Sequence, residues 1–205
     1  MTIIYLIRHG ESILNTKAIV QGDHDDPTNH LSARGREQAA AVANKLSAIS
    51  VACIYTSPLT RAHETAGAIA AKHPLKMDVY HDLHEKNQGS MRGMQIGAAL
   101  AKYGDWENMT EDERLDTRAV PNEESQRDLY HRALRVVKDL SQKHAEQTIF
   151  CITHGGFMRA LYTQLAHKSL KEKWRFDNCG FMKIKVDGDH ITILETDKLH
   201  LELRG

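Results

Sequence analysis

The sequence has few of the residues that stabilise a protein by means other than a hydrophobic core. It contains 3 cysteines and 4 prolines in 205 residues, and aromatic residues make up 6% of the chain. Cys53, Cys151 and Cys179 are an odd number, and the first two lie in apolar runs where thiols pack as small hydrophobes. This pattern argues against a disulfide scaffold and predicts a reducing compartment, for which we expect the cytoplasm.

Long hydrophobic runs are also lacking. The apolar run near the N-terminus, residues 3–7, is interrupted at Arg8, and no stretch approaches the ~20 apolar residues of a membrane span. We therefore expect a soluble chain without a signal peptide and without a membrane partner.

The chain has no excess of charge of either sign, since 27 Lys and Arg balance 27 Asp and Glu. A nucleic-acid partner is therefore not expected, because such proteins normally carry a wide basic face. Any anion-binding site must be local. The unusual count is that of histidine, at 13 residues.

Hydrophobic periodicity predicts strands that alternate with helices. Continuous apolar runs at 3–7 and 148–153, each followed by His-Gly, are typical of strands buried on both faces of a parallel sheet. Further strands are predicted near residues 51–55, 77–80, 181–186 and 191–195, and helices near 32–49, 96–103, 125–142 and 157–166. Another helix is predicted to start at Ser57-Pro58, with Ser57 as its N-cap.

This order predicts an α/β fold, a three-layer α/β/α sandwich with a mostly parallel central sheet. We expect one domain over residues 1–205, in which residues 89–124 form an insertion that caps the active site. Ligands in such sheets bind beyond the carboxyl ends of the strands. Because His9, Ser57 and His154 each follow a predicted strand, they are expected to converge.

The segment Arg8-His9-Gly10 suits phosphoryl chemistry. An unprotonated imidazole can attack phosphorus, Gly10 leaves room beside the backbone, and the Arg8 guanidinium matches phosphate oxygens. Taken alone, the tripeptide fits equally well a structural histidine beside a solvated arginine.

Two further segments point to an anion. Arg61 lies near the start of a predicted helix, where the helix dipole disfavours a cation unless an anionic group is close. His154 and Gly155 join a buried strand to a helix whose N-terminal N–H groups can bind an anion. An exposed surface arginine is the alternative for Arg61.

Together these segments resemble the histidine phosphatase superfamily, in its phosphoglycerate mutase-like branch. The resemblance covers nearly the whole chain and rests on the order of the following segments: Leu6-Ile7-Arg8-His9-Gly10-Glu11-Ser12 with Asn15, Gln21-Gly22, Leu31-Ser32-Ala33-Arg34-Gly35, Thr56-Ser57-Pro58-Leu59-Thr60-Arg61-Ala62, Glu85 with Gly89 and Gly93, Glu124-Ser125 and Thr153-His154-Gly155-Gly156.

The resemblance implies a role for each matched residue. His9 would be the nucleophile, and Glu85 would protonate the leaving oxygen and then activate water. The remaining positions would bind the phosphoryl oxygens: Arg8, Asn15, Gln21, Gly22, Arg61, His154 and Gly155. The resemblance implies no metal and no cofactor, and the partner would be a small phosphorylated substrate.

Glu85 has two alternative interpretations. It lies in a polar stretch and could be a surface carboxylate, and His81-x-x-His84-Glu85 has a spacing found in metal sites. We favour the catalytic role because the glycines at positions 89 and 93 match the family pattern and no further ligand motif is present.

Three departures from the family pattern concern the substrate's surroundings. About three residues, 28–30, are inserted before Leu31, so His24 or His30 could contact substrate, although a plain polar loop is favoured. Glu123 replaces a usual glycine. The Trp-Arg-Arg-Ser-Tyr segment of glycolytic phosphoglycerate mutases is absent, which favours hydrolysis over mutase activity.

The first hypothesis is thus a metal-independent phosphomonoesterase that forms a phosphohistidine on His9. Alternatives are a phosphoglycerate mutase, a sugar-bisphosphate phosphatase, or a non-catalytic phospho-ligand-binding regulatory protein. The complete reactive set argues against the last of these. The substrate and the oligomeric state cannot be read from the sequence. Candidate wall residues, each equally compatible with a solvated surface, are Lys86, Asn87, Arg92, Tyr103, Trp106 and Arg118.

Overall fold

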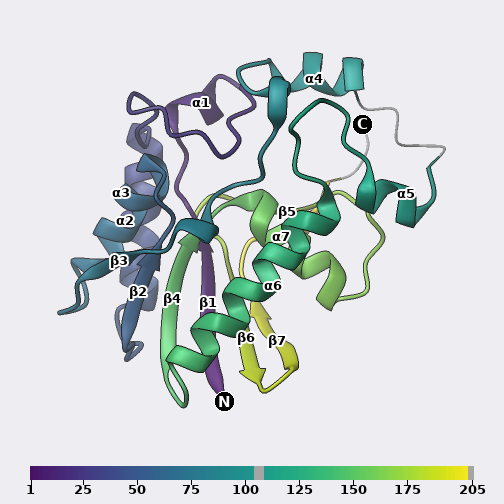
Figure 1. Ribbon diagram of the computed structural model, residues 1–205. Helices are drawn as coiled ribbons and strands as arrows, with labels where there is room; N and C mark the ends of the chain where they lie inside the picture. The colour runs from purple at the N-terminus through teal and green to yellow at the C-terminus, as the bar shows by residue number, and fades with distance from the viewer. Residues whose placement is uncertain (104–108, 203–205) are drawn as a thin grey trace.

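The computed structural model describes residues 1–103 and 109–202, and its centre is a six-stranded sheet (Figure 1). The strand order is β3-β2-β4-β1-β6-β7. Neighbours from β3 to β1 are parallel, and β6 is antiparallel to both β1 and β7. The strands are β1 (Thr2–Arg8), β2 (Cys53–Thr56), β3 (Met77–Val79), β4 (Thr148–Thr153), β6 (Phe181–Asp187) and β7 (His190–Thr196). The predicted mostly parallel sheet is confirmed.

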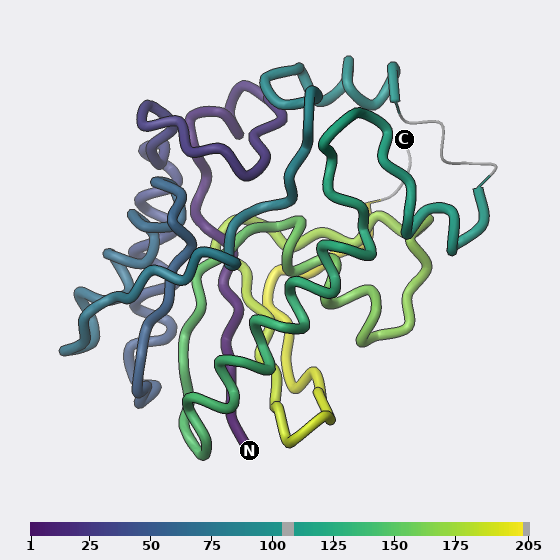
Figure 2. Tube along the Cα trace, viewed as in Figure 1, coloured from purple at the N-terminus to yellow at the C-terminus, as the bar shows by residue number. Residues whose placement is uncertain are grey.

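Helices cover both faces of the sheet. Helices α2 (Ala33–Leu46) and α3 (Thr60–Ala70) pack on one face, and α6 (Gln126–Lys143) and α7 (Gly155–Leu165) pack on the other (Figures 1 and 2). Successive side chains of β1 point to opposite faces of the sheet and so contribute to both hydrophobic cores. Ile4 and Leu6 pack in the core under α6 and α7, while Tyr5 and Ile7 pack in the core under α2 and α3. The three-layer sandwich is therefore confirmed.

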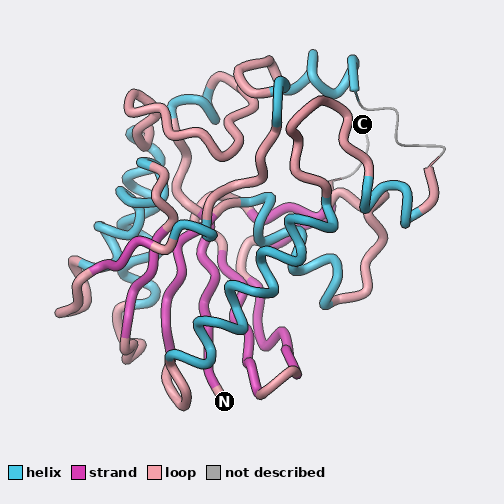
Figure 3. The backbone as a smooth tube through the Cα atoms, viewed as in Figure 1, coloured by secondary structure: helices cyan, strands magenta, loops and turns pink. Residues whose placement is uncertain are grey.

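Shorter elements and loops gather at the carboxyl ends of the central strands (Figure 3). They are α1 (Ile13–Thr16), η1 (His81–Leu83), η2 (Gly89–Met91), α4 (Ile96–Tyr103), α5 (Glu111–Asp116) and the antiparallel pair β5 (Trp174–Phe176) and β8 (Leu199–Leu201). Within the segment 89–124, Met91, Ala99 and Val120 form a small apolar cluster of their own. Within the described ranges, no helix has the length and apolar character needed to cross a membrane.

The predicted start of α3 is wrong. The N-cap is Leu59, which is extended and gives no side-chain cap, and the helix begins at Thr60. The exposed Asp25 supplies the missing cap, because its carboxylate accepts hydrogen bonds from the Thr60 N–H at 2.8 Å and from the Thr60 hydroxyl at 2.9 Å. An acidic residue from the preceding loop thus stands at the helix end that carries Arg61.

The loop after β1 packs tightly against the start of α2. A Cβ on Gly35 would lie 1.9 Å from the Glu11 carbonyl oxygen, and a Cβ on Gly10 would lie 2.6 Å from the Gly35 carbonyl oxygen. Both contacts are with backbone, which cannot yield as a flexible side chain can. The loop that follows His9 therefore depends on two residues without side chains.

We expect Gly35→Ala to lower the free energy of unfolding by ~1–3 kcal/mol or more, because the added methyl group overpacks two backbone segments. Urea denaturation would measure the change. Gly67→Ala is the matched control, since nothing lies within 4 Å of its added Cβ in α3, and it should raise stability by roughly 0.5–1 kcal/mol. Equal stabilities of the two variants would contradict the packing described.

Candidate active site

His9 and His154 lie side by side because the strands that precede them are adjacent, parallel and in register. Arg8 at the end of β1 pairs with Thr153 at the end of β4. The two imidazole centroids are 5.1 Å apart, with an angle of 58° between the ring planes. Ser57, which follows β2, places its hydroxyl oxygen 2.8 Å from Nε2 of His154. The predicted convergence of the three strand ends is confirmed, and Ser57 contacts a histidine rather than capping a helix.

Hydrogen bonds orient the His9 ring. Its Nδ1 lies 2.7 Å from the Gly10 carbonyl oxygen, so this nitrogen carries the proton and Nε2 holds the lone pair. Nε of Arg61 donates to that Nε2 at 3.3 Å, and Nη2 of Arg61 donates to the Gly22 carbonyl oxygen at 2.9 Å. A neutral nucleophilic nitrogen therefore faces a guanidinium.

Burial sets the charge states at this centre. Burial, followed by the charges of Arg61 and Arg8, lowers the pKa of His9 well below its usual 6.5, and burial and Arg61 do the same for His154. Burial lowers the pKa of both arginines to about 10, which leaves them protonated at neutral pH. Neutral histidines thus stand among permanent cations.

We expect Arg61→Met to raise the pKa of His9 toward 6.5, because the substitution removes a cation that disfavours imidazolium. In the unaltered protein His9 stays neutral as the pH falls below 6.5, whereas in the variant protonation begins at a higher pH. An NMR titration of the His9 imidazole would measure this, with Arg61→Lys as the charge-retaining control. An unchanged pKa in the Met variant would refute the electrostatic account.

Two side-chain amides line the site and share Ser12. The Ser12 hydroxyl lies 3.1 Å from Oδ1 of Asn15 and 3.1 Å from Oε1 of Gln21, and Oδ1 of Asn15 also accepts from the Ser12 N–H at 3.0 Å. Because both amide oxygens accept hydrogen bonds from the protein, both NH₂ groups are available as donors. Such donors suit an oxyanion.

The inserted loop acts on the site through Asn29. This buried side chain donates to Oε1 of Gln21 at 2.8 Å and accepts from the Leu14 N–H at 2.9 Å. His24 and His30 are exposed and do not line the cavity, and His30 instead pairs with Glu64 at 2.6 Å. Contact of either histidine with substrate is therefore not supported, and Asn29 is a supporting residue that the sequence reasoning missed.

Glu85 is held by backbone N–H groups on both carboxylate oxygens. The Gly156 N–H donates to Oε2 at 3.0 Å, and the Lys86 N–H donates to Oε1 at 2.7 Å. A Cβ on Gly156 would lie 2.3 Å from Oε1, so a larger residue here would displace the carboxylate from this position. The side chain lines the same cavity as His9, which argues against a plain surface carboxylate.

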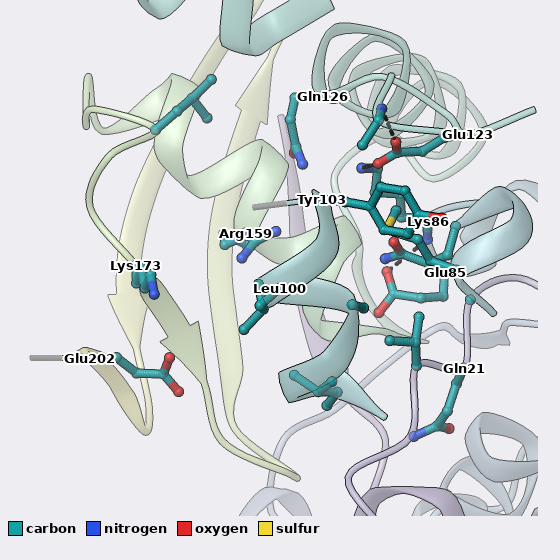
Figure 4. A pocket seen from close by; sticks show the side chains of 18 of the residues that line it. Gln21, Glu85, Lys86, Leu100, Tyr103, Glu123, Gln126, Arg159, Lys173 and Glu202 are labelled. Carbon is teal, nitrogen blue, oxygen red and sulfur yellow. Dashed lines mark hydrogen bonds and ion pairs between the residues drawn. The ribbon is translucent and has the colours of Figure 1, made fainter. Parts of the chain in front are cut away.

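The cavity has a volume of about 780 Å³ and contains most of the predicted site residues. Figure 4 shows part of its lining, in which Gln21 and Glu85 are labelled. Those that line it are Arg8, His9, Asn15, Gln21, Gly22, Arg61 and Glu85. His154 and Gly155 do not line it. His154 is fully buried behind the wall, and its Nδ1 has no hydrogen-bond partner among the residues the structure describes.

The outer wall differs from the predicted one. Lys86 and Tyr103 line the cavity, whereas Asn87, Arg92 and Arg118 do not, and Trp106 falls outside the described residues. Arg92 pairs with Asp23, and Arg118 pairs with Asp128. Glu123, expected near the substrate, also lines the cavity, whereas the wall residues Arg114, Gln126 and Arg159 were not expected from the sequence. Of these residues, only Arg159 could have been expected from the sequence, because it follows Gly156 by three residues and so lies on the same face of the helix.

Glu123, the departure from the usual glycine, forms a buried ion pair with Lys86. Its second oxygen accepts from the Ala119 N–H at 2.6 Å. Burial lowers the pKa of Lys86, and Glu123 opposes that shift. The pair ties the residue after Glu85 to the segment 119–123 and cancels one positive charge in the cavity wall.

Known proteins resemble this chain along nearly its full length. Phosphoglycerate mutase-like protein 4 from Arabidopsis thaliana is 33% identical over 206 residues, which cover 98% of this chain and 88% of the relative. Phosphoserine phosphatase 1 from Hydrogenobacter thermophilus is 30% identical, over 95% of this chain and 92% of the relative. The solved structure of Bacillus stearothermophilus YhfR superposes with a TM-score of 0.81 at 27% identity, over 95% of this chain and 96% of that chain.

The family assignment agrees with the geometry of the cavity. The model of the histidine phosphatase superfamily (branch 1) matches residues 4–198, which include His9, Arg61, Glu85 and His154. A match of this length, together with the buried histidine pair at the ends of β1 and β4, leads to one conclusion: the chain belongs to branch 1 of the histidine phosphatase superfamily.

Proposed function

We propose that the protein hydrolyses the phosphate monoester of a small metabolite through a phosphohistidine on His9. The observation that carries the proposal is the neutral Nε2 of His9, which meets the Arg61 guanidinium in a cavity that also contains Glu85. Nucleophile, cation and proton donor are thus in one chamber, as double displacement at phosphorus requires.

In the first step, Nε2 of His9 attacks phosphorus and the ester P–O bond breaks. Protonated Glu85 gives its proton to the leaving oxygen and becomes a carboxylate. In the second step, that carboxylate takes a proton from water, the water oxygen bonds to phosphorus, and the P–N bond breaks. Inorganic phosphate leaves, and His9 and protonated Glu85 are restored.

Charge on the transferred group is balanced by the protein's own cations. Arg8 is fixed by donation from Nη1 to the Phe176 carbonyl oxygen at 2.6 Å, while its Nε has no partner among the described residues. Arg61 faces His9 directly. Two guanidinium groups supply the stabilisation that other phosphatases take from metal ions, so the proposed reaction requires no metal and no cofactor.

The remaining predicted residues complete the phosphate site in this proposal. Asn15 and Gln21 donate from their NH₂ groups, and Gly22 fixes Arg61 through its carbonyl oxygen. His154 contributes the unpaired Nδ1, supported by the 5.1 Å separation of its ring from His9. Gly155 leaves Arg8 room, since a Cβ there would lie 3.3 Å from the Arg8 Nε.

Residues 89–124 serve as a cap within a single domain. Met91, Ala99, Tyr103 and Arg114 from this segment line the cavity that holds His9, which supports the assignment. We also place the protein in the cytoplasm. The support for this compartment is the state of Cys53, Cys151 and Cys179, all of which carry free thiols.

The test is phosphate release from a panel of phosphorylated metabolites and one aryl phosphate, in excess chelator. Hydrolysis of members of the panel under chelation supports the proposal. Transfer of phosphate between the carbons of phosphoglycerate faster than phosphate release would instead establish a mutase. Binding without turnover of any member would identify a regulatory binder and overturn the proposal.

A further inference from the structure

The cavity continues beyond the phosphoryl centre to a wall that contains Arg159 of α7. Figure 4 shows Arg159 between one side that carries Glu85 and Lys86 and another that carries Lys173 and Glu202. Lys173 is exposed at the rim, whereas Arg159 is largely enclosed. Nothing in the proposed reaction uses this guanidinium.

The guanidinium of Arg159 makes no hydrogen bond and no ion pair with any residue in the described ranges. Its acidic neighbours are already engaged. Glu202 pairs with Nη1 of Arg175 at 2.7 Å, and both oxygens of Glu85 accept from backbone N–H groups. Lys86, the enclosed lysine of the described wall, is neutralised by Glu123.

An unpaired guanidinium in such a position has an energetic cost. Burial lowers the pKa of Arg159, and the charges of Glu85 and Glu202 offset that shift only in part. An anion that enters the cavity would pair with it and satisfy its donors, in the planar two-point geometry that carboxylates offer. The side chain is therefore prepared for an anionic part of a ligand.

Helix geometry places Arg159 near the residue that holds Glu85. Arg159 follows Gly156 by three residues, so it lies on the same face of α7, roughly 4.5 Å further along the axis. The Gly156 N–H holds Glu85, the proposed proton donor to the leaving oxygen. An anion bound by Arg159 would therefore lie in the same cavity as Glu85, on the side of the leaving group.

From this arrangement we infer that Arg159 binds a carboxylate of the substrate, so that the substrate is a small phosphorylated carboxylic acid. The inference rests on the proposed phosphatase function. Phosphoserine, named in the relatives, carries a carboxylate three bonds from its ester oxygen, and phosphoethanolamine is the same molecule without that carboxylate.

The test compares kcat/KM for phosphoserine and phosphoethanolamine in the unaltered protein and in Arg159→Met. We expect the unaltered protein to prefer phosphoserine by roughly tenfold or more, and the variant to lose that preference through a higher KM for phosphoserine. Arg159→Lys, which keeps the charge and loses the planar fork, should retain an intermediate preference. Lys173→Met removes a rim cation and is the matched control, with its preference intact.

Two outcomes overturn the inference while leaving the phosphatase function intact: hydrolysis of both substrates without preference, or a preference that survives in Arg159→Met. A preference lost in Lys173→Met but kept in Arg159→Met would assign the carboxylate to the rim. Failure of the unaltered protein to hydrolyse any phosphate monoester would instead refute the proposed function. Circular dichroism and the urea midpoint of Arg159→Met separate lost recognition from lost folding.

Discussion

Replacement of His9 by alanine should abolish phosphate release, with a loss of at least ~10⁴-fold in kcat for an aryl phosphate. The methyl group cannot form the P–N bond, and no other neutral nitrogen with a lone pair lines the described part of the cavity. His154 is not expected to substitute, because its ring is fully buried and its Nε2 is paired with the Ser57 hydroxyl at 2.8 Å. The assay is release of the aryl alcohol and of phosphate in excess chelator.

A second measurement identifies the intermediate. Rapid acid-free quenching of the unaltered protein with ³²P-labelled substrate should leave label that is stable to base and labile to acid, as a phosphoramidate is. His30→Ala is the matched control, because His30 is exposed and lies outside the cavity, and it should be labelled normally. Residual activity of His9→Ala near that of the unaltered protein would disprove the mechanism.

Replacement of Glu85 by glutamine should have an effect that depends on the leaving group. For an alkyl phosphate, whose leaving oxygen needs a proton, we expect kcat to fall by ~10²–10⁴-fold. For an aryl phosphate the first step proceeds without that proton, so the loss appears in the second step, where water must be activated. The variant should then show a burst of about one aryl alcohol per site, followed by slow turnover, in a stopped-flow assay.

Gly156→Ala provides an independent check on the position of Glu85. Its added Cβ would displace Oε1, from which it lies 2.3 Å away, so the same discrimination between alkyl and aryl leaving groups should appear in weaker form. Gly97→Ala, in open space within α4, controls for the change of glycine to alanine. If Glu85→Gln slows both classes of substrate equally and gives no burst, Glu85 is not the proton donor.

The sheet and its helices were predictable because their signals are local. Apolar runs of the length of β1 and β4 and the spacing of α2 and α6 each express burial on a fixed face. The start of α3 was not predictable from Ser57-Pro58, because its cap comes from Asp25, which lies 35 residues earlier. A cap from a distant loop leaves no pattern around the helix that it caps.

The same distinction applies to the site. His9 and His154 were predictable because each follows a buried strand and parallel strands end at one edge. The contact of Asn29 with Gln21 and the ion pair of Lys86 with Glu123 were not predictable, since each joins side chains across a loop whose course depends on packing. Arg159 drew no attention for another reason: its importance lies in the partners that it lacks.

The position of β1 in the sheet also has a consequence for the order of assembly. His9 directly follows β1, which precedes the other described strands in the chain, yet the two neighbours of β1 in the sheet, β4 and β6, are Thr148–Thr153 and Phe181–Asp187. A nascent chain therefore holds β1, and His9 directly after it, without a partner strand until β4 (Thr148–Thr153) has emerged from the ribosome. Closing loops of this size slows folding, so His9 and His154 can come together only after β4 and the residues that follow it have been synthesised.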